Sequence, residues 1–408
     1  MERSTRPRGT VFELRVLAIV LALALQVQAT LPFGEAGIRV AVSDLLLPIA
    51  LIYAAIGWGR PSLRPRWRVP GLYGWLLGIS AVMTAALIVG YLEFGRWLSW
   101  AVINKWGGWF ALSAYFLVGG SIASAGGAAL REEFLRVFLG AAAAVAAINA
   151  FCMPWLLMHY TLPFGIEFSR ATGGMQNANA FGFLLAVASL LVIAMQHSAF
   201  LYLAALLSAL WFTSSRGAVL ALLAGLVTLL AMSPRRAAAV VKPAGVAVLA
   251  VVAISAASVV IDPVRLAQAE SGHSPIGFFS IERLDPESAT IDQRRAQNGR
   301  AIELFARAPL LGHGLGYFIE STGQTLHNSL LWLVIETGLV GTIAFVGFLF
   351  CCVYRLYLGR EDPFLLGMVA VAAAFMAMSL SGEFLYQRHL WLLLGMALAL
   401  PAGKAEPR

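Results

Sequence analysis

The chain has 408 residues, of which 60 % are hydrophobic and only 12 % are charged, and its formal net charge is +8. A soluble domain usually carries about 25 % charged residues, so the composition excludes a soluble globular protein and indicates a polytopic membrane protein. The basic residues form short clusters between apolar runs, as orientation signals do, which argues against nucleic-acid binding. The three cysteines lie in or beside apolar runs and predict neither a disulfide framework nor a thiolate metal site.

The chain begins with a basic segment and the apolar run 16–31. This run fits a cleaved signal peptide, because 27–29 resembles a small-residue cleavage site, or an uncleaved first span, which we favour. Runs of about 17–25 apolar residues predict transmembrane helices. Eleven further spans are expected at 38–58, 71–92, 103–123, 134–153, 178–196, 198–213, 217–232, 244–261, 326–350, 364–383 and 386–401. The expected fold is all-α, with about twelve transmembrane helices.

The distribution of arginine and lysine decides the orientation of these spans. Fifteen of these residues lie on the side that holds both termini, against six in the short loops of the opposite side. Cytoplasmic loops carry the excess of positive charge, so both termini are expected in the cytoplasm. The chain then divides into nine spans within 1–261, one large outer loop at 262–325, and three spans within 326–408.

The loop 262–325 is the main polar segment of the chain. It holds six arginines and eight acidic residues, with glycines and prolines between them, as a folded loop in water does. We expect a helix around 291–308, whose apolar residues Ile302, Leu304 and Phe305 would lay one face on the membrane. This helix would roof a site at the outer surface.

Several polar residues from separate parts of the chain fall on the outer face under this topology. An arginine at a membrane boundary is often only a snorkelling anchor, but outward arginines run against the orientation rule. Guanidinium groups suit the binding of phosphate through paired hydrogen bonds, so the pattern predicts a phosphate or pyrophosphate ligand at the outer surface. The residues are Arg170, Asn177, Asn179, Arg216, Arg294, Arg295, His327, Asn328 and Arg388.

Four short patterns carry a resemblance to a known family. They are 170–179, Ser215-Arg216-Gly217, the glycine-rich 309–316, and His327-Asn328 followed by Glu336-Thr337-Gly338-Leu339. Together they resemble the bacterial O-antigen ligase and O-antigen polymerase superfamily. The resemblance implies transfer of a glycan from an undecaprenyl-pyrophosphate carrier to an acceptor hydroxyl at the periplasmic face of the inner membrane. It implies a lipid-linked glycan donor and a lipid-embedded or glycan acceptor as partners.

The resemblance also implies roles for individual residues. His327 is similar to the catalytic base, and Arg216 and Arg294 are similar to the two pyrophosphate ligands. Arg295 stays an alternative to Arg294, because the family often has a tryptophan four residues after the loop arginine and Asn298 stands there instead. Arg170 is expected as a further pyrophosphate ligand. The expected weaker substrate contacts are Asn177, Asn179, Asn328, Arg388 and Glu383.

The chemistry agrees with these residue types. An attacking sugar hydroxyl must lose a proton, and a neutral imidazole suits that task. The charge of a departing pyrophosphate needs a divalent metal or arginines. The aspartates Asp262, Asp285 and Asp292 of the outer loop are far apart in sequence and form no pair of metal-ligand type, so we expect a reaction without a metal or a cofactor.

Two acidic residues lie within predicted spans. Glu336 follows His327 by nine residues, so on a regular helix it lies on the opposite side and about 14 Å deeper. It is not expected to orient His327. Asp44 and Glu336 are expected to form structural hydrogen bonds between helices, and His313 is expected to belong to the structure of its glycine-rich turn.

Three alternatives stand beside a ligase. A polymerase of the same superfamily needs two lipid-linked glycans side by side, and the single large outer loop favours one carrier site beside an open acceptor groove. A secondary transporter is disfavoured by the same loop and by the lack of an internal repeat. A structural scaffold explains neither the outward arginines nor His327.

Overall fold

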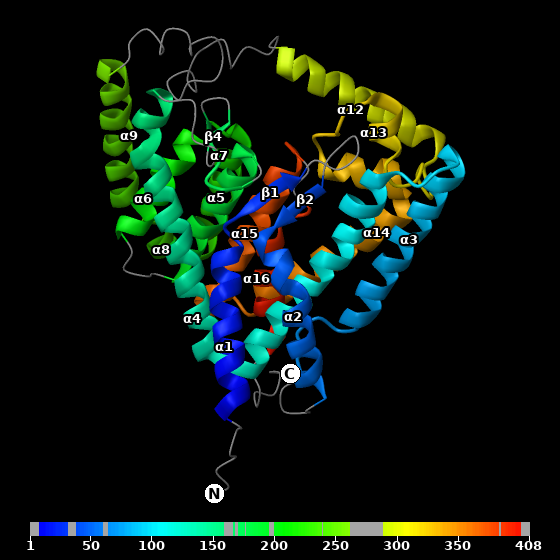
Figure 1. Ribbon diagram of the computed structural model, residues 1–408, viewed down its shortest axis with the longest axis horizontal. Coiled ribbons are helices and arrows are strands. Elements are labelled where there is room, and N and C mark those ends of the chain that lie inside the picture. Colours follow the sequence, from blue (N-terminus) through cyan, green and yellow to red (C-terminus); the bar gives the residue numbers. More distant parts are fainter. Residues whose placement is uncertain are drawn as a thin grey trace, which may run out of the picture.

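The computed structural model describes residues 8–31, 38–59, 64–158, 166–167, 170–175, 177–195, 200–238, 240–261, 289–382 and 385–400. The regular structure of these residues is nearly all helical, as the composition predicts (Figure 1). The helices are α1 (Arg8–Ala24), α2 (Val42–Trp58), α3 (Leu72–Phe94), the π-helix η1 (Trp100–Gly107), α4 (Gly108–Met158), α5 (Ala178–Met195), α6 (Phe200–Phe212), α7 (Arg216–Met232), α8 (Pro234–Ala238), α9 (Val241–Ile261), α12 (Ala289–Arg307), α13 (Tyr317–Thr322), α14 (Ser329–Leu358), α15 (Pro363–Ser379) and α16 (Arg388–Leu398).

Short strands complete the described structure. They form three antiparallel pairs, each of two strands. The pairs are β1 (Gln28–Leu31) with β2 (Ile38–Ala41), β3 (Arg66–Trp67) with β6 (Ala399–Leu400), and β4 (Ile166–Glu167) with β5 (Arg170–Ala171). The pair β1–β2 lies at the same end of the molecule as α12 and α13, far from the first turn of α1 (Figure 1).

Five described helices are long and apolar enough to cross a membrane. The prediction of about twelve spans is therefore not confirmed by helix length, because the other apolar helices have only 10–17 residues. An 11-residue helix such as α16 rises about 16 Å, which is roughly half of the hydrocarbon core of a bilayer. The five helices that qualify are Leu72–Phe94, Trp100–Ala150, Ala178–Met195, Pro234–Ile254 and Ser329–Leu358.

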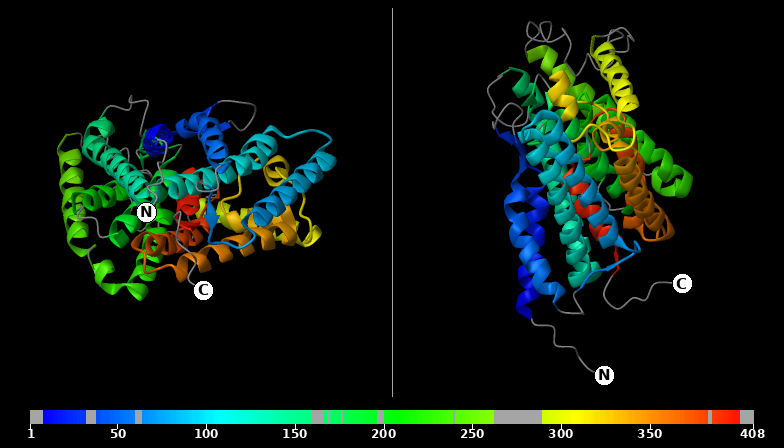
Figure 2. Two further views of the ribbon diagram at one scale, coloured as in Figure 1. Left: turned by 90° about the horizontal axis from the view of Figure 1, so that it is seen from below. Right: turned by 90° about the vertical axis from the view of Figure 1, so that its right-hand side faces the viewer.

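Helix α16 is buried within the protein. Residues His389–Leu398 of this helix are all buried, and the helix lies in the middle of the molecule with other helices around it (Figure 2). It packs against α4 and α15. The apolar run that predicted a span at 386–401 therefore reflects burial within protein, where side chains of a helix are apolar on every side.

The expected spans 103–123 and 134–153 also differ from the structure. Residues 108–158 form one helical element, which is interrupted only at Gly127, where φ is 64° and ψ is −158°. Arg131, expected in a cytoplasmic loop, lies within this element and pairs with Asp362 at 3.1 Å. A glycine with positive φ breaks the helical hydrogen-bond pattern at one residue, so the chain changes direction without a loop.

Helix α14 is interrupted at Gly338, where φ is 65°. The backbone of the loop between α12 and α13 lies beside this interruption. Leu339 N donates to Pro309 O at 2.9 Å, and His313 N donates to Ile335 O at 2.8 Å. These bonds satisfy backbone groups that an interrupted helix would otherwise leave without partners inside a membrane.

The crossing between this loop and two helices leaves no room for side chains. A Cβ on Gly338 would collide with the carbonyl of Leu310, and a Cβ on Gly314 would collide with the backbone of Gly90 in α3. Gly314 also has a φ of 93°, which favours glycine. The tight backbone geometry expected of the glycine-rich segment 309–316 is thus confirmed.

We expect Gly338→Ala to lower the free energy of unfolding by about 2 kcal/mol or more, because a left-handed backbone alone costs an L-residue about 1–2 kcal/mol. Gly78→Ala is the matched control, since its Cβ would meet nothing within 4 Å. That substitution should leave stability unchanged or raise it slightly. Thermal unfolding of both variants in detergent measures the difference. Equal melting temperatures would show that the interruption at Gly338 carries no constraint.

Candidate active site

Arg216 is the first residue of α7, and its side chain is exposed. The turn before it contains Ser214 with φ 49°, which is uncommon for a residue other than glycine. The hydroxyl of Ser215 accepts a hydrogen bond from Ala218 N at 3.3 Å and caps the helix. The first backbone N–H groups of a helix favour an anion, so Arg216 extends from a point where the backbone also favours negative charge.

Arg170 braces this turn. Its Nε donates to the carbonyl of Thr213 at 2.8 Å, and its Nη2 donates to Asn179 Oδ1 at 2.9 Å. Arg170 therefore joins the start of α5 to the turn before Arg216, and Thr213 in that turn is 43 residues away in sequence. Asn177 has a different local task, because its Oδ1 accepts from Ala180 N at 2.8 Å in the first turn of α5.

Arg294 approaches Arg216 from α12. Burial, and then the positive charge of Arg216, lower the pKa of the Arg294 guanidinium below its ordinary value. Among the residues that the structure describes, no carboxylate forms an ion pair with Arg294. The neighbouring Arg295 is exposed, whereas Arg294 is half-buried. The positive charge of Arg216 thus acts on Arg294, and the choice between Arg294 and Arg295 as the loop pyrophosphate ligand stays a prediction.

The helix that carries Arg294 confirms one prediction and corrects another. It spans Ala289–Arg307, close to the expected 291–308. Its apolar residues do not form one membrane-facing surface, because Leu304 is 1 % exposed while Ile302 is 60 % exposed. Leu304 belongs to the protein core, and α12 packs on α14. The reason is that α12 lies against α14, so the side of α12 that carries Leu304 is buried between the two helices.

His327 lies immediately before α14, and its side chain is exposed. The next residue, Asn328, caps the helix, since its Oδ1 accepts from Leu330 N at 3.0 Å and from Leu331 N at 3.1 Å. A side-chain cap fixes the direction in which the chain enters a helix. Asn328 therefore positions the backbone at His327, and its predicted contact with substrate stays a prediction.

The starts of α7 and α14 meet at one turn after α15. A Cβ on Gly217 would collide with the hydroxyl of Ser381, and Ser329 Oγ donates to Gly382 O at 2.9 Å. Arg216 precedes Gly217 and His327 lies two residues before Ser329. The two predicted site residues therefore stand on elements that share a neighbour.

Helix α12 is tied to the same region. Gln297 Nε2 donates to Gln324 Oε1 at 2.7 Å, and Gln324 lies three residues before His327. Gln297 follows Arg294 by three residues, so both belong to one side of the helix. The structure thus brings Arg216, Arg294 and His327 to one region from three elements.

Lys105 is a residue whose position the sequence did not predict. It lies near the start of the expected span 103–123, and the structure places it in η1 with its side chain 2 % exposed. Its ammonium lies 4.2 Å from the ring centroid of Trp332, 5.3 Å from that of Tyr386 and 5.4 Å from that of Trp100. Such contacts stabilise a buried cation, and π-helical turns are frequent at functional sites. Two flanking tryptophans, at 100 and 106, were the available signal.

Arg388 forms an ion pair with Asp44 in α2. Its Nη2 lies 2.7 Å from Asp44 Oδ2, and its Nε donates to Asp44 Oδ1 at 2.8 Å. Tyr115 donates to the same carboxylate at 2.8 Å. The interhelical bonds expected of Asp44 are confirmed. They occupy Nε and Nη2 of Arg388, whose predicted contact with substrate stays a prediction.

Glu336 and His313 have structural contacts. The carboxylate of Glu336 is buried and accepts from Gly316 N at 2.9 Å, so one of its partners is the residue that precedes α13. His313 Nε2 lies 2.8 Å from Leu304 O, and its ring stacks on Tyr317. Glu383 lies outside the described residues.

The fold and these contacts define a multi-pass membrane protein in which arginines from two helices meet near an exposed histidine. Residues 201–346 match the family model described as O-antigen ligase. This range contains Arg216, Arg294 and His327, and the match supports the resemblance to the O-antigen ligase superfamily. No curated protein matched the chain.

Proposed function

We propose that this protein transfers a glycan from an undecaprenyl-pyrophosphate carrier to an acceptor hydroxyl at the periplasmic face of the bacterial inner membrane. The family match supports lipid-linked glycans as substrates in a membrane. The observation that carries the proposal is the approach of Arg216 and Arg294 from α7 and α12. Two guanidinium groups whose charges act on each other repel, and an anion between them removes the repulsion. A pyrophosphate has the charge that this pair favours.

The residues divide the reaction between them. The acceptor oxygen attacks the anomeric carbon, the bond from that carbon to the pyrophosphate oxygen breaks, and its electron pair stays on the pyrophosphate. His327 takes the proton of the acceptor hydroxyl. Arg216 and Arg294 stabilise the charge that grows on the leaving group, while Arg170 holds the turn before Arg216. The products are the glycosylated acceptor and undecaprenyl pyrophosphate.

This proposal includes an orientation for the chain. The segment 262–325, with α12 in it, would face the periplasm, and the spans within 1–261 and 326–408 would leave both termini in the cytoplasm. The excess of arginine and lysine on the side of the termini supports this orientation. Undecaprenyl-linked glycans and the acceptor would then meet His327 in the outer leaflet.

We further propose a ligase, with a polymerase as the alternative. A ligase needs one carrier site beside a groove for a lipid-embedded acceptor, and one pair of arginines meets that need. Deletion of the gene should leave full-length polymer on undecaprenyl pyrophosphate together with an unmodified acceptor. Gel analysis of both pools measures this outcome. Accumulation of single repeat units on the carrier would instead decide for the polymerase.

A further inference from the structure

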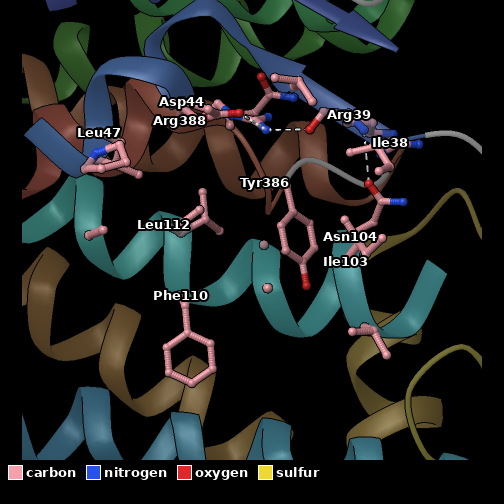
Figure 3. Close-up of a pocket in the computed structure, with 18 of the residues that line it drawn as sticks. Ile38, Arg39, Asp44, Leu47, Ile103, Asn104, Phe110, Leu112, Tyr386 and Arg388 are labelled. Atoms are coloured by element: carbon pink, nitrogen blue, oxygen red, sulfur yellow. Dashed lines mark hydrogen bonds and ion pairs between the residues drawn. The ribbon is translucent and has the colours of Figure 1, made fainter. Parts of the chain in front are cut away.

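A cavity of about 640 Å³ lies between β2, α2, the junction of η1 with α4, and the segment before α16. Its size is within the range of small-ligand sites, about 300–1,000 Å³. Most of its wall is apolar, with Leu47, Leu51, Phe110 and Leu112 among the lining side chains. Figure 3 shows Arg39, Asp44 and Arg388 along one side of the cavity and Phe110 away from them. The cavity thus has an apolar body and a charged edge.

Among the described residues that line the cavity, two arginines and one aspartate form its charged edge: Arg39, Asp44 and Arg388. Asp44 and Arg388 form an ion pair. The Arg39 guanidinium lies 4.9 Å from the ring centroid of Trp100, and Arg39 N donates to Asn104 Oδ1 at 3.2 Å. A fixed cation at the end of an apolar cavity suits a ligand with an anionic head and a hydrocarbon body.

The cavity borders the helix that follows His327. Tyr386 lines it, donates from its hydroxyl to Lys105 O at 3.1 Å, and packs its ring 6.0 Å from the ring of Trp332 in α14. Glycine at 108 permits this arrangement, since a Cβ there would lie 2.7 Å from the Tyr386 ring. A single aromatic layer therefore separates the cavity from the first turns of α14.

We propose that this cavity binds a hydrocarbon chain of a phosphorylated membrane lipid, with the phosphate of that lipid at Arg39. The site is separate from the arginine pair at α7 and α12, so it provides a second lipid site in the same protein. The next step rests on the proposed transfer reaction. The lipid in this cavity is the acceptor, and its hydrocarbon chain holds it beside α14, the helix that follows His327. The apolar wall excludes a glycan as the occupant of the cavity body.

Photolabelling tests this site without reference to transfer. The probe is phosphatidic acid with a diazirine in one acyl chain, and the protein is reconstituted in phosphatidylcholine vesicles. Peptides that contain residues 38–51 and 102–114 should be labelled. Ala111→Trp and Leu51→Trp each fill the cavity from a different helix and should reduce that labelling at least fivefold. Ile148→Trp is the matched control, because this residue of α4 is 62 % exposed, and it should leave labelling unchanged.

Two further arms identify the head group. Arg39→Ala should reduce labelling by phosphatidic acid and spare labelling by a diazirine diacylglycerol, which lacks the phosphate. Excess inorganic phosphate should not compete; competition would mean that the edge binds free phosphate and would overturn the lipid assignment. Unchanged labelling in both tryptophan variants would overturn the cavity itself. The His327→Ala variant should be labelled normally, so a failure of the cavity and a failure of the transfer reaction give different results.

Discussion

His327→Ala should reduce glycan transfer by on the order of 10²–10⁴, which is the typical loss when a general base is removed. The imidazole stands at the exposed start of α14, and Asn328 fixes its backbone. Binding of the lipid-linked donor should be retained, because the proposed pyrophosphate ligands are on α7 and α12. Single-turnover transfer and donor binding, both measured in proteoliposomes, separate the two effects.

The histidine substitution has an internal control. Ser321→Ala changes an exposed residue of α13, outside the proposed machinery, and should transfer at the normal rate. If His327→Ala transfers at nearly the normal rate while it remains folded, the base has been assigned to the wrong residue.

Arg294→Ala should reduce transfer by on the order of 10²–10³, because one of two cations that stabilise the leaving group is lost. Arg295→Ala is the matched control, since Arg295 is the exposed neighbour on the same helix. A substitution at an exposed position changes the free energy of unfolding by about 0.5 kcal/mol at most, so the Arg295→Ala variant should stay folded. Its transfer rate should stay close to normal, because Arg295 is outside the proposed pair of ligands. Initial rates at saturating donor and donor affinity measure both variants. A large loss for Arg295→Ala with none for Arg294→Ala would reverse the choice between the two arginines.

Arg216→Lys examines the same pair from α7. Lysine keeps the positive charge but loses the planar fork that binds two phosphate oxygens at once. We expect weaker donor binding or slower turnover, and a loss smaller than that of Arg216→Ala. In the double variant Arg216→Ala, Arg294→Ala the losses should not add, because both side chains hold one ligand. Additive losses would indicate that the arginines bind separate groups.

The sequence predicted those parts of the site that depend on local patterns. The helix at Ala289–Arg307 was expected from its residue pattern, and the glycines of 309–316 indicated tight turns that the structure has. The choice between Arg294 and Arg295 was beyond the sequence, because it depends on how α12 is rotated about its axis. Packing of Leu304 against the core fixes that rotation.

Features that depend on distant segments were not predictable. Arg388 and Asp44 are 344 residues apart, so nothing in either segment shows that they pair. The interruption at Gly338 requires the backbone of Pro309 and Leu310 beside it, and hydropathy shows only one long apolar run. The number of spans stays a prediction, because hydropathy does not distinguish a helix buried in protein from one exposed to lipid.

The central claim is transfer from a pyrophosphate carrier by a histidine and two arginines, and one reaction tests it most directly. Purified protein is reconstituted with an undecaprenyl-pyrophosphate-linked glycan and an acceptor lipid, in excess chelator. We predict continued transfer, with one undecaprenyl pyrophosphate formed for each glycan moved, because arginines and not a metal ion balance the leaving charge. Loss of transfer that magnesium or manganese restores, or glycosylated acceptor without undecaprenyl pyrophosphate, would contradict this account.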